Sequence, residues 1–237
     1  KYILLLTYFI GLIFGFPIGA KLTADFYYIG YIDQKHAEIL SALSNHFSLP
    51  FIITYALSDQ LGIHNHYSIY LVSLYLPSVF GVLIMLSLTK NGSDCLTQKI
   101  PAQGFKLNMQ IVDAGIMKGF ETLIKLCGYI VLFSIIARMP RIIADKAIIQ
   151  KPVFIDIISS FLEATNGISI ICEIPVSHIL TRMLCIALLS FGGISCIVQT
   201  KSIFQGQQYN LKNYILLKSI MSISSCLIFI MLFCILV

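Results

Sequence analysis

Apolar residues are grouped along this chain into long runs and are not scattered singly among polar ones. The runs cover residues 2–20, 67–89, 111–139, 183–200 and 219–237. A helix needs about 20 apolar residues to cross the hydrocarbon core of a bilayer, and each run is near that length. The pattern therefore predicts an all-α, polytopic membrane protein with about five full spans.

Short polar, glycine-rich segments interrupt the apolar sequence at matching places in the two halves. They lie at residues 15–21 and 44–50 in the first half, and at residues 161–168 and 189–195 in the second. Inside a membrane, non-helical backbone is stable only where protein or a water-filled cavity supplies its hydrogen bonds. Paired interruptions of this kind point to the binding site of a transporter built from inverted repeats.

The interruptions also predict two re-entrant helical hairpins. Asp33 is a suitable N-cap for an amphipathic helix over residues 34–43, since a short side-chain oxygen can accept the first free backbone N–H groups. A polar tip at residues 44–50 and an apolar return to residue 57 complete this hairpin, for which an ordinary surface loop is the alternative. Residues 153–174 have the same character in the second half.

These elements divide the chain into two halves, residues 1–110 and 111–237, within one membrane domain. Residues 90–106 are predicted to form a water-facing loop, and residues 138–151 a second, basic connector. Basic connectors flank both sides of one span, so the positive-inside rule does not fix the orientation. Residue 1 is Lys, and we expect further apolar sequence to precede it.

Composition agrees with a membrane location. The 237 residues are 57% hydrophobic and only 11% charged, with a mean hydropathy of +0.87, whereas soluble domains carry about 25% charged residues. The net charge of +5 is spread between the apolar runs, which indicates membrane-flanking anchors and not a nucleic-acid interface.

No motif indicates an enzyme or a cofactor. The seven cysteines form no C-x-x-C pair and mostly lie in apolar runs, so we interpret them as small buried hydrophobes. His64 and His66 beside Asp59 are a weak metal pattern, and a polar interfacial loop is the preferred interpretation. Glu121 and Lys125 have the i, i+4 order of a helical ion pair and are expected to be structural.

Candidate solute-binding residues in the first half flank the two interruptions. Pro17 and Gly19 interrupt helix and can turn backbone groups towards a solute, although a kink at a tight helix crossing is the alternative. Ser44, Asn45 and Ser48 can cap a half-helix and hold a ligand. Lys21, just past the first break, is better explained as a residue that extends to the membrane interface.

In the second half the candidates centre on an acidic residue within apolar sequence. Glu163, with Thr165 and Asn166 beside it, is predicted to bind solute or to couple transport to H⁺ or Na⁺, because intramembrane ionisable residues are costly. Its alternative role is a structural partner for broken backbone. A structural carboxylate is expected to tolerate Gln, and an ion-binding one is not.

The last candidates lie in the fourth apolar run. Gly192 and Gly193 are expected to unwind the helix or to approach the Glu163 hairpin closely. Ser195 and Gln199 are spaced i, i+4 and are predicted to point into the same polar cavity.

Several ordered motifs resemble the sporulation integral membrane protein YlbJ family, within the nucleoside-recognition or Gate superfamily. They are Gly15-Phe16-Pro17-Ile18-Gly19-Ala20-Lys21, the Ser44-Asn45 tip, Gly128-Tyr129-Ile130 leading to Phe133-Ser134, Leu162-Glu163-Ala164-Thr165-Asn166-Gly167, and Phe191-Gly192-Gly193-Ile194-Ser195 with Gln199. The resemblance covers nearly the whole chain. It departs at His46 and Phe47, where a smaller turn is expected.

The resemblance implies a multi-pass protein of a bacterial cell membrane, related in fold to concentrative nucleoside transporters. It implies movement of a small polar or anionic solute, which is dipicolinate for the sporulation members. The alternatives are a nucleoside-type importer and a non-transporting membrane protein needed for sporulation or assembly. The expected partners are the solute and the lipid bilayer, and homo-oligomerisation stays open. No cofactor is expected, apart from a coupling ion.

Overall fold

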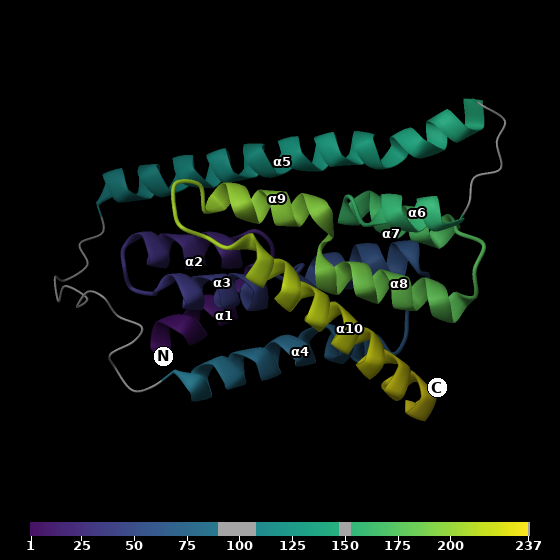
Figure 1. Cartoon of the computed structure of the whole chain (residues 1–237), viewed down its shortest axis with the longest axis horizontal. Helices are drawn as coiled ribbons and strands as arrows, with labels where there is room; N and C mark the ends of the chain where they lie inside the picture. The colour runs from purple at the N-terminus through teal and green to yellow at the C-terminus, as the bar shows by residue number, and fades with distance from the viewer. Residues whose placement is uncertain (90–107, 147–152, 237) are drawn as a thin grey trace.

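The computed structural model describes residues 1–89, 108–146 and 153–236, and the regular elements in these ranges are all helical (Figure 1). The helices are α1 (Tyr2–Phe14), α2 (Ile18–Tyr28), α3 (Gln34–Ser44), the π-helix η1 (Phe51–Gln60), α4 (Tyr67–Leu88), α5 (Met109–Lys146), α6 (Val153–Ser160), α7 (Ala164–Glu173), α8 (His178–Phe191), α9 (Gly193–Ile203) and α10 (Leu211–Leu236). The all-α prediction is confirmed for the described residues.

Four stretches of the described chain are long and apolar enough to cross a membrane: Tyr67–Leu88, Met109–Ile143, His178–Ile203 and Leu211–Leu236. They correspond to four of the five expected spans, and they fit a membrane protein. The first expected span, residues 2–20, does not form one helix. Its helix α1 has 13 residues and is only about 20 Å long, against roughly 30 Å for the hydrocarbon core.

Two short helical hairpins precede the broken helices. In the first, α1 and α2 fold back on each other about residues 15–17, and an added Cβ on Gly11 would touch Gly19 across the pair. In the second, α6 and α7 pack together about residues 161–163. This helix pair lies within residues 153–174, where the sequence predicted a hairpin, and its re-entrant character stays a prediction.

The first predicted hairpin, centred on residues 44–50, is wrong. The chain reverses one element earlier, between α1 and α2. Residues 45–48 are not a hairpin tip but a break between α3 and η1. Helix α3 packs on α1, α2, α4 and α10, whereas η1 packs on α7. The physical reason is that glycines of α1 and α2 let that pair close tightly and occupy the space beside α3.

The elements of the two halves follow the same order. Each half has a hairpin (α1/α2 or α6/α7), a broken helix (α3–η1 or α8–α9) and a long helix (α4 or α10). In Figure 1, α1 and α6 enter from opposite ends of the molecule and run towards its middle. The four chain interruptions therefore come together near the centre.

Helix α5 connects the two halves and is longer than expected. It is continuous through Pro140 to Lys146, so the connector predicted to begin at residue 138 is helical at its start. Proline removes one helical hydrogen bond, and side chains anchor this end: Arg138 Nη2 donates to Asn166 Oδ1 at 2.9 Å, and Arg141 pairs with Glu173. The predicted loop at residues 90–106 and the end of the second connector lie outside the described residues.

The start of α3 forms as its sequence predicts. The Asp33 carboxylate accepts the His36 backbone N–H at 2.7 Å, which is an N-cap bond. Ala37, Leu40 and Leu43 on the apolar face are buried. The cap and the apolar face together fix how α3 enters the core.

Candidate functional site

In the first half, the hairpin tip is seated on the break of the following helix. The Phe16 N–H donates to the His46 carbonyl oxygen. An added Cβ on Gly15 would collide with Ser48, and one on Gly19 would collide with the Ser44 carbonyl oxygen. These contacts bring two of the predicted site segments together: residues 15–19 and the break at residues 44–48.

The second half repeats this arrangement with different bonds. The backbone N–H groups of Ile194 and Ser195 donate to the carbonyl oxygens of Phe161 and Leu162 at 2.8 and 2.9 Å. Gly192 and Gly193 have φ angles of 93° and 77°, which side-chain-bearing residues resist. The predicted close approach to the Glu163 hairpin is confirmed at Gly193, where an added Cβ would lie 3.2 Å from the Phe161 carbonyl oxygen, whereas one at Gly192 would meet Cys196.

Glu163 is buried, and its carboxylate caps α7. Oε1 accepts the backbone N–H and the hydroxyl of Thr165 at 2.9 and 2.8 Å. Oε2 accepts the backbone N–H of Asn166 at 2.8 Å and its side-chain amide at 3.2 Å. Both oxygens are therefore occupied by donors of the hairpin itself, and the structural alternative describes this conformation.

Asn166 ties the Glu163 hairpin to α5. Its Nδ2 donates to Ser134 Oγ at 2.6 Å, and its Oδ1 accepts from Arg138. Thr165 links the hairpin to the other half, because its carbonyl oxygen accepts the Tyr55 hydroxyl at 2.7 Å. Phe47, in the first break, packs against the same apolar cluster that contains Ala164 and Ile168. The two predicted tips thus share one core.

A buried lysine lies between the breaks of the two halves. Lys218 of α10 donates from Nζ to the carbonyl oxygen of Asn45 at 2.6 Å and to that of Ser190 at 3.5 Å. The Asn45 amide donates to Thr200 Oγ1 and to the Tyr214 hydroxyl. Asn45 Oδ1 and His46 Nε2 are buried and have no hydrogen-bond partner among the residues that the structure describes.

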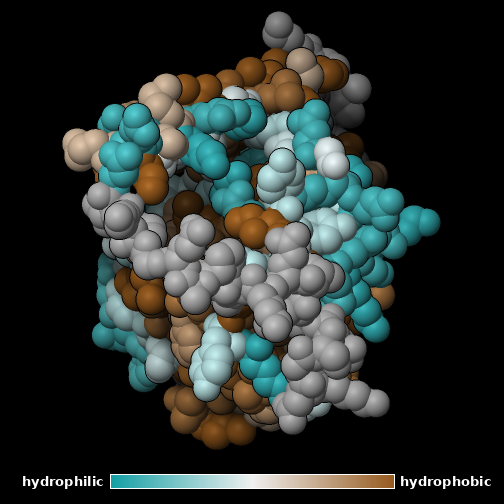
Figure 2. All heavy atoms as spheres, turned by 90° about the vertical axis from the view of Figure 1, so that its left-hand side faces the viewer, coloured by the Kyte–Doolittle hydropathy of each residue, from teal (hydrophilic) through white to brown (hydrophobic). Residues whose placement is uncertain are grey.

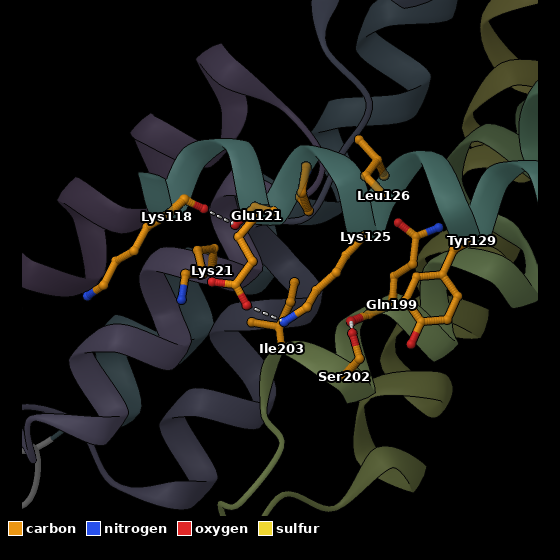
Figure 3. A pocket seen from close by; sticks show the side chains of 11 residues that line it. Lys21, Lys118, Glu121, Lys125, Leu126, Tyr129, Gln199, Ser202 and Ile203 are labelled. Atoms are coloured by element: carbon orange, nitrogen blue, oxygen red, sulfur yellow. Dashed lines mark hydrogen bonds and ion pairs between the residues drawn. The ribbon is translucent and has the colours of Figure 1, made fainter. Parts of the chain in front are cut away.

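A cavity of about 170 Å³ opens between α2, α5 and α9. Figure 3 shows Tyr129 of α5 beside Gln199 of α9, and the side chains of Glu121 and Lys125 meeting in an ion pair near Lys21. Pro17 and Lys21 at the start of α2 also line the cavity. The volume is below the roughly 300–1,000 Å³ of pockets for drug-sized ligands, so it suits a small solute.

The cavity lining is basic. Lys21, Lys118 and Lys125 line it together with Glu121, and Lys21 also pairs with the neighbouring Asp25 at 3.2 Å. Glu121 is paired with Lys125 at 2.7 Å, which confirms the expected helical pair, and Lys118 forms no ion pair with the described residues. Figure 2, which views the left-hand end of Figure 1, shows hydrophilic residues gathered on this face and a hollow beneath α5.

The structure separates some of the predicted site residues. Pro17 and Gln199 line the basic cavity, but Ser195 is 1% exposed and does not line it. Ser195 and Gln199 therefore do not share that cavity as predicted. Ser44 Oγ donates to the Leu40 carbonyl oxygen of its own helix. The Ser44 backbone packs against Gly11 and Gly19 of the α1/α2 hairpin.

Sequence reasoning missed Lys218, Thr200 and Tyr214. A signal for Lys218 was present, because Tyr214, Lys218, Met221, Ser225 and Phe229 recur every three or four residues and are all buried. A lysine on the apolar face of a membrane-spanning helix places an ionisable group inside the membrane. It was overlooked because it directly precedes the uncharged run at residues 219–237.

Comparisons with protein-family models, with curated proteins and with solved structures find no match to this chain. The function is therefore argued from the geometry of the site.

Proposed function

We propose that this chain is a membrane transporter that moves a small anionic solute by alternating access. The observation that carries the proposal is the matched seating of a hairpin tip on a helix break in each half. Transporters with inverted repeats place their binding sites at such discontinuous helices, near the interface of the repeats. The resemblance to the Gate superfamily supports the same mechanism.

The basic cavity favours an anion over a neutral solute. Three lysines and one glutamate line it. Lys21 pairs with Asp25 and Lys125 pairs with Glu121, which leaves the Lys118 ammonium without an ion pair among the described residues. Helix α2 begins beside the cavity, with the positive end of its helix dipole at Pro17 and Ile18. The Gln199 amide and the hydroxyls of Ser202 and Tyr129 are neutral donors for carboxylate oxygens. We assign first contact with the solute to this cavity.

Uptake by the purified chain in liposomes tests the proposal. The labelled panel is dipicolinate, a short dicarboxylate, phosphate and uridine, so that one assay separates an anion transporter from a nucleoside importer. We expect concentration-dependent uptake of at least one anion and none of uridine. No uptake of any solute would contradict the proposal and favour an assembly role.

Matched lysine variants test the cavity itself. Lys21→Met and Lys125→Met should each reduce uptake at low solute concentration about tenfold, since a charge-assisted bond contributes roughly 1.5–3 kcal/mol. Lys212→Met is the control, because Lys212 is an exposed lysine of α10 outside the cavity. Equal uptake by all three variants would remove the cavity from the solute path.

A further inference from the structure

Lys218 is a buried charge with no acidic partner among the described residues. Lys218 is 2% exposed, and no carboxylate in the described part of the chain forms an ion pair with it. Its hydrogen-bond acceptors are the backbone carbonyl oxygens of Asn45 and Ser190. An ammonium group taken out of water is costly unless its charge is compensated.

Two helix ends provide that compensation. Asn45 is the C-cap of α3, and Ser190 lies in the last turn of α8, which ends at Phe191. The last carbonyl groups of a helix have no intrahelical partner, and each C-terminus acts like about −0.5 elementary charge. Two such ends, one from each half, together compensate part of the charge of one ammonium group.

In secondary transporters, unwound carbonyls and half-helix C-termini of this kind coordinate the coupling cation. We infer that the Lys218 ammonium is a tethered cation that occupies this position, so that no Na⁺ binds between the two breaks. The placement of the Lys218 ammonium at a cation site rests on the geometry alone. The conclusion that transport is not coupled to Na⁺ at this site rests on the proposed function. The Lys218 amine thereby holds the two halves together at their centre.

The break retains an acceptor that a free cation would use. Asn45 Oδ1 is buried and has no hydrogen-bond partner in the described part of the chain, and the backbone oxygen of the same residue binds Lys218. If the lysine side chain is shortened to Ala, the carbonyl oxygens of Asn45 and Ser190 lose their donor. Oxygen ligands of this type suit a small hard cation such as Na⁺ or an alkylammonium ion.

The test is thermal unfolding of the full chain in detergent, without solute, in NaCl, choline chloride or methylammonium chloride at equal ionic strength. Wild-type Tm should be the same in NaCl and in choline chloride. Lys218→Ala should lower Tm in choline by roughly 5 °C or more, and Na⁺ or methylammonium should restore part of the loss. Lys218→Met should be destabilised without ion rescue, because its side chain fills the gap.

Lys212→Ala, an exposed lysine of the same helix, is the control and should keep the wild-type Tm in all three salts. A rise of wild-type Tm in NaCl overturns the inference, and so does a Lys218→Ala variant that is as stable as wild type or is rescued by neither ion. If the Ala variant does not fold, the wild-type comparison and Lys218→Arg decide: Arg should keep most of the stability. Because no solute is present, absence of transport would not affect these results.

Discussion

Glu163 shows how differently one residue is interpreted alone and in its surroundings. An acidic residue in apolar sequence indicates ion coupling, yet its two oxygens accept four hydrogen bonds from Thr165 and Asn166. This geometry leads us to expect that even a structural carboxylate at this position does not tolerate Gln. Both oxygens face N–H donors, so the NH₂ group of Gln would oppose one of them and leave it unpaired.

We therefore expect Glu163→Gln and Glu163→Ala to lower the free energy of unfolding by similar amounts, on the order of 1–3 kcal/mol. Glu163→Asp should lose less, since Asp is a strong N-cap residue. Chemical or thermal unfolding in detergent measures this order. A Gln variant as stable as wild type would show that one oxygen suffices and would return Glu163 to the ion-coupling candidates.

The hairpins depend on close backbone contact between elements. Gly11 and Gly19 let α1 and α2 approach each other and the end of α3, and a Cβ at Gly19 would overlap the Ser44 carbonyl carbon and oxygen. Backbone atoms cannot move aside as a flexible side chain can. The packing of these three helices therefore depends on the absence of a side chain at position 19.

Gly19→Ala should destabilise the chain by roughly 1–3 kcal/mol through overpacking. The control is Gly128→Ala on α5, where a Cβ would meet nothing within 4 Å, and helix propensity should make that change neutral or stabilising by up to about 1 kcal/mol. Denaturant unfolding of both variants checks the pair. If Gly19→Ala matched Gly128→Ala, α1 and α2 would not be packed on α3 in this way.

At the scale of the whole molecule, the two halves are joined at Lys218 and are open at the basic cavity. Gln199 lines that cavity, whereas Ser195, one turn earlier on α9, is enclosed against Leu162. The structure thus describes one state, with the cavity accessible and the seat of the second hairpin closed. The proposed alternating access would require that this difference in accessibility changes during the transport cycle.

Thiol labelling measures how accessible positions 195 and 199 are from water. With the native cysteines replaced, Gln199→Cys should react faster with a small water-soluble thiol reagent than Ser195→Cys. Both residues are buried, at 4% and 1% exposure, but Gln199 lines the cavity and Ser195 does not. A transported anion should change the labelling rate at position 199. Rapid labelling at position 195 without solute would show that the second hairpin is not seated on its break as described.

The sequence by itself determined the class of the protein and the places where its helices break. Long apolar runs cannot be hidden in a soluble fold of this size, and Pro17, Gly192 and Gly193 interrupt helices through their own backbone chemistry. The α3 cap at Asp33 was equally local. Such features depend on residues a few positions apart, so they can be predicted from the sequence.

Only the tertiary structure decided which interruption turns back and what each polar group bonds. The reversal lies at residues 15–17 and not at 44–50, because glycines from two helices meet there. Glu163 is a cap, Gln199 lines a cavity that Ser195 does not, and Lys218 compensates two helix ends that are distant in sequence. These outcomes depend on contacts between residues far apart in the chain, and local pattern does not encode them.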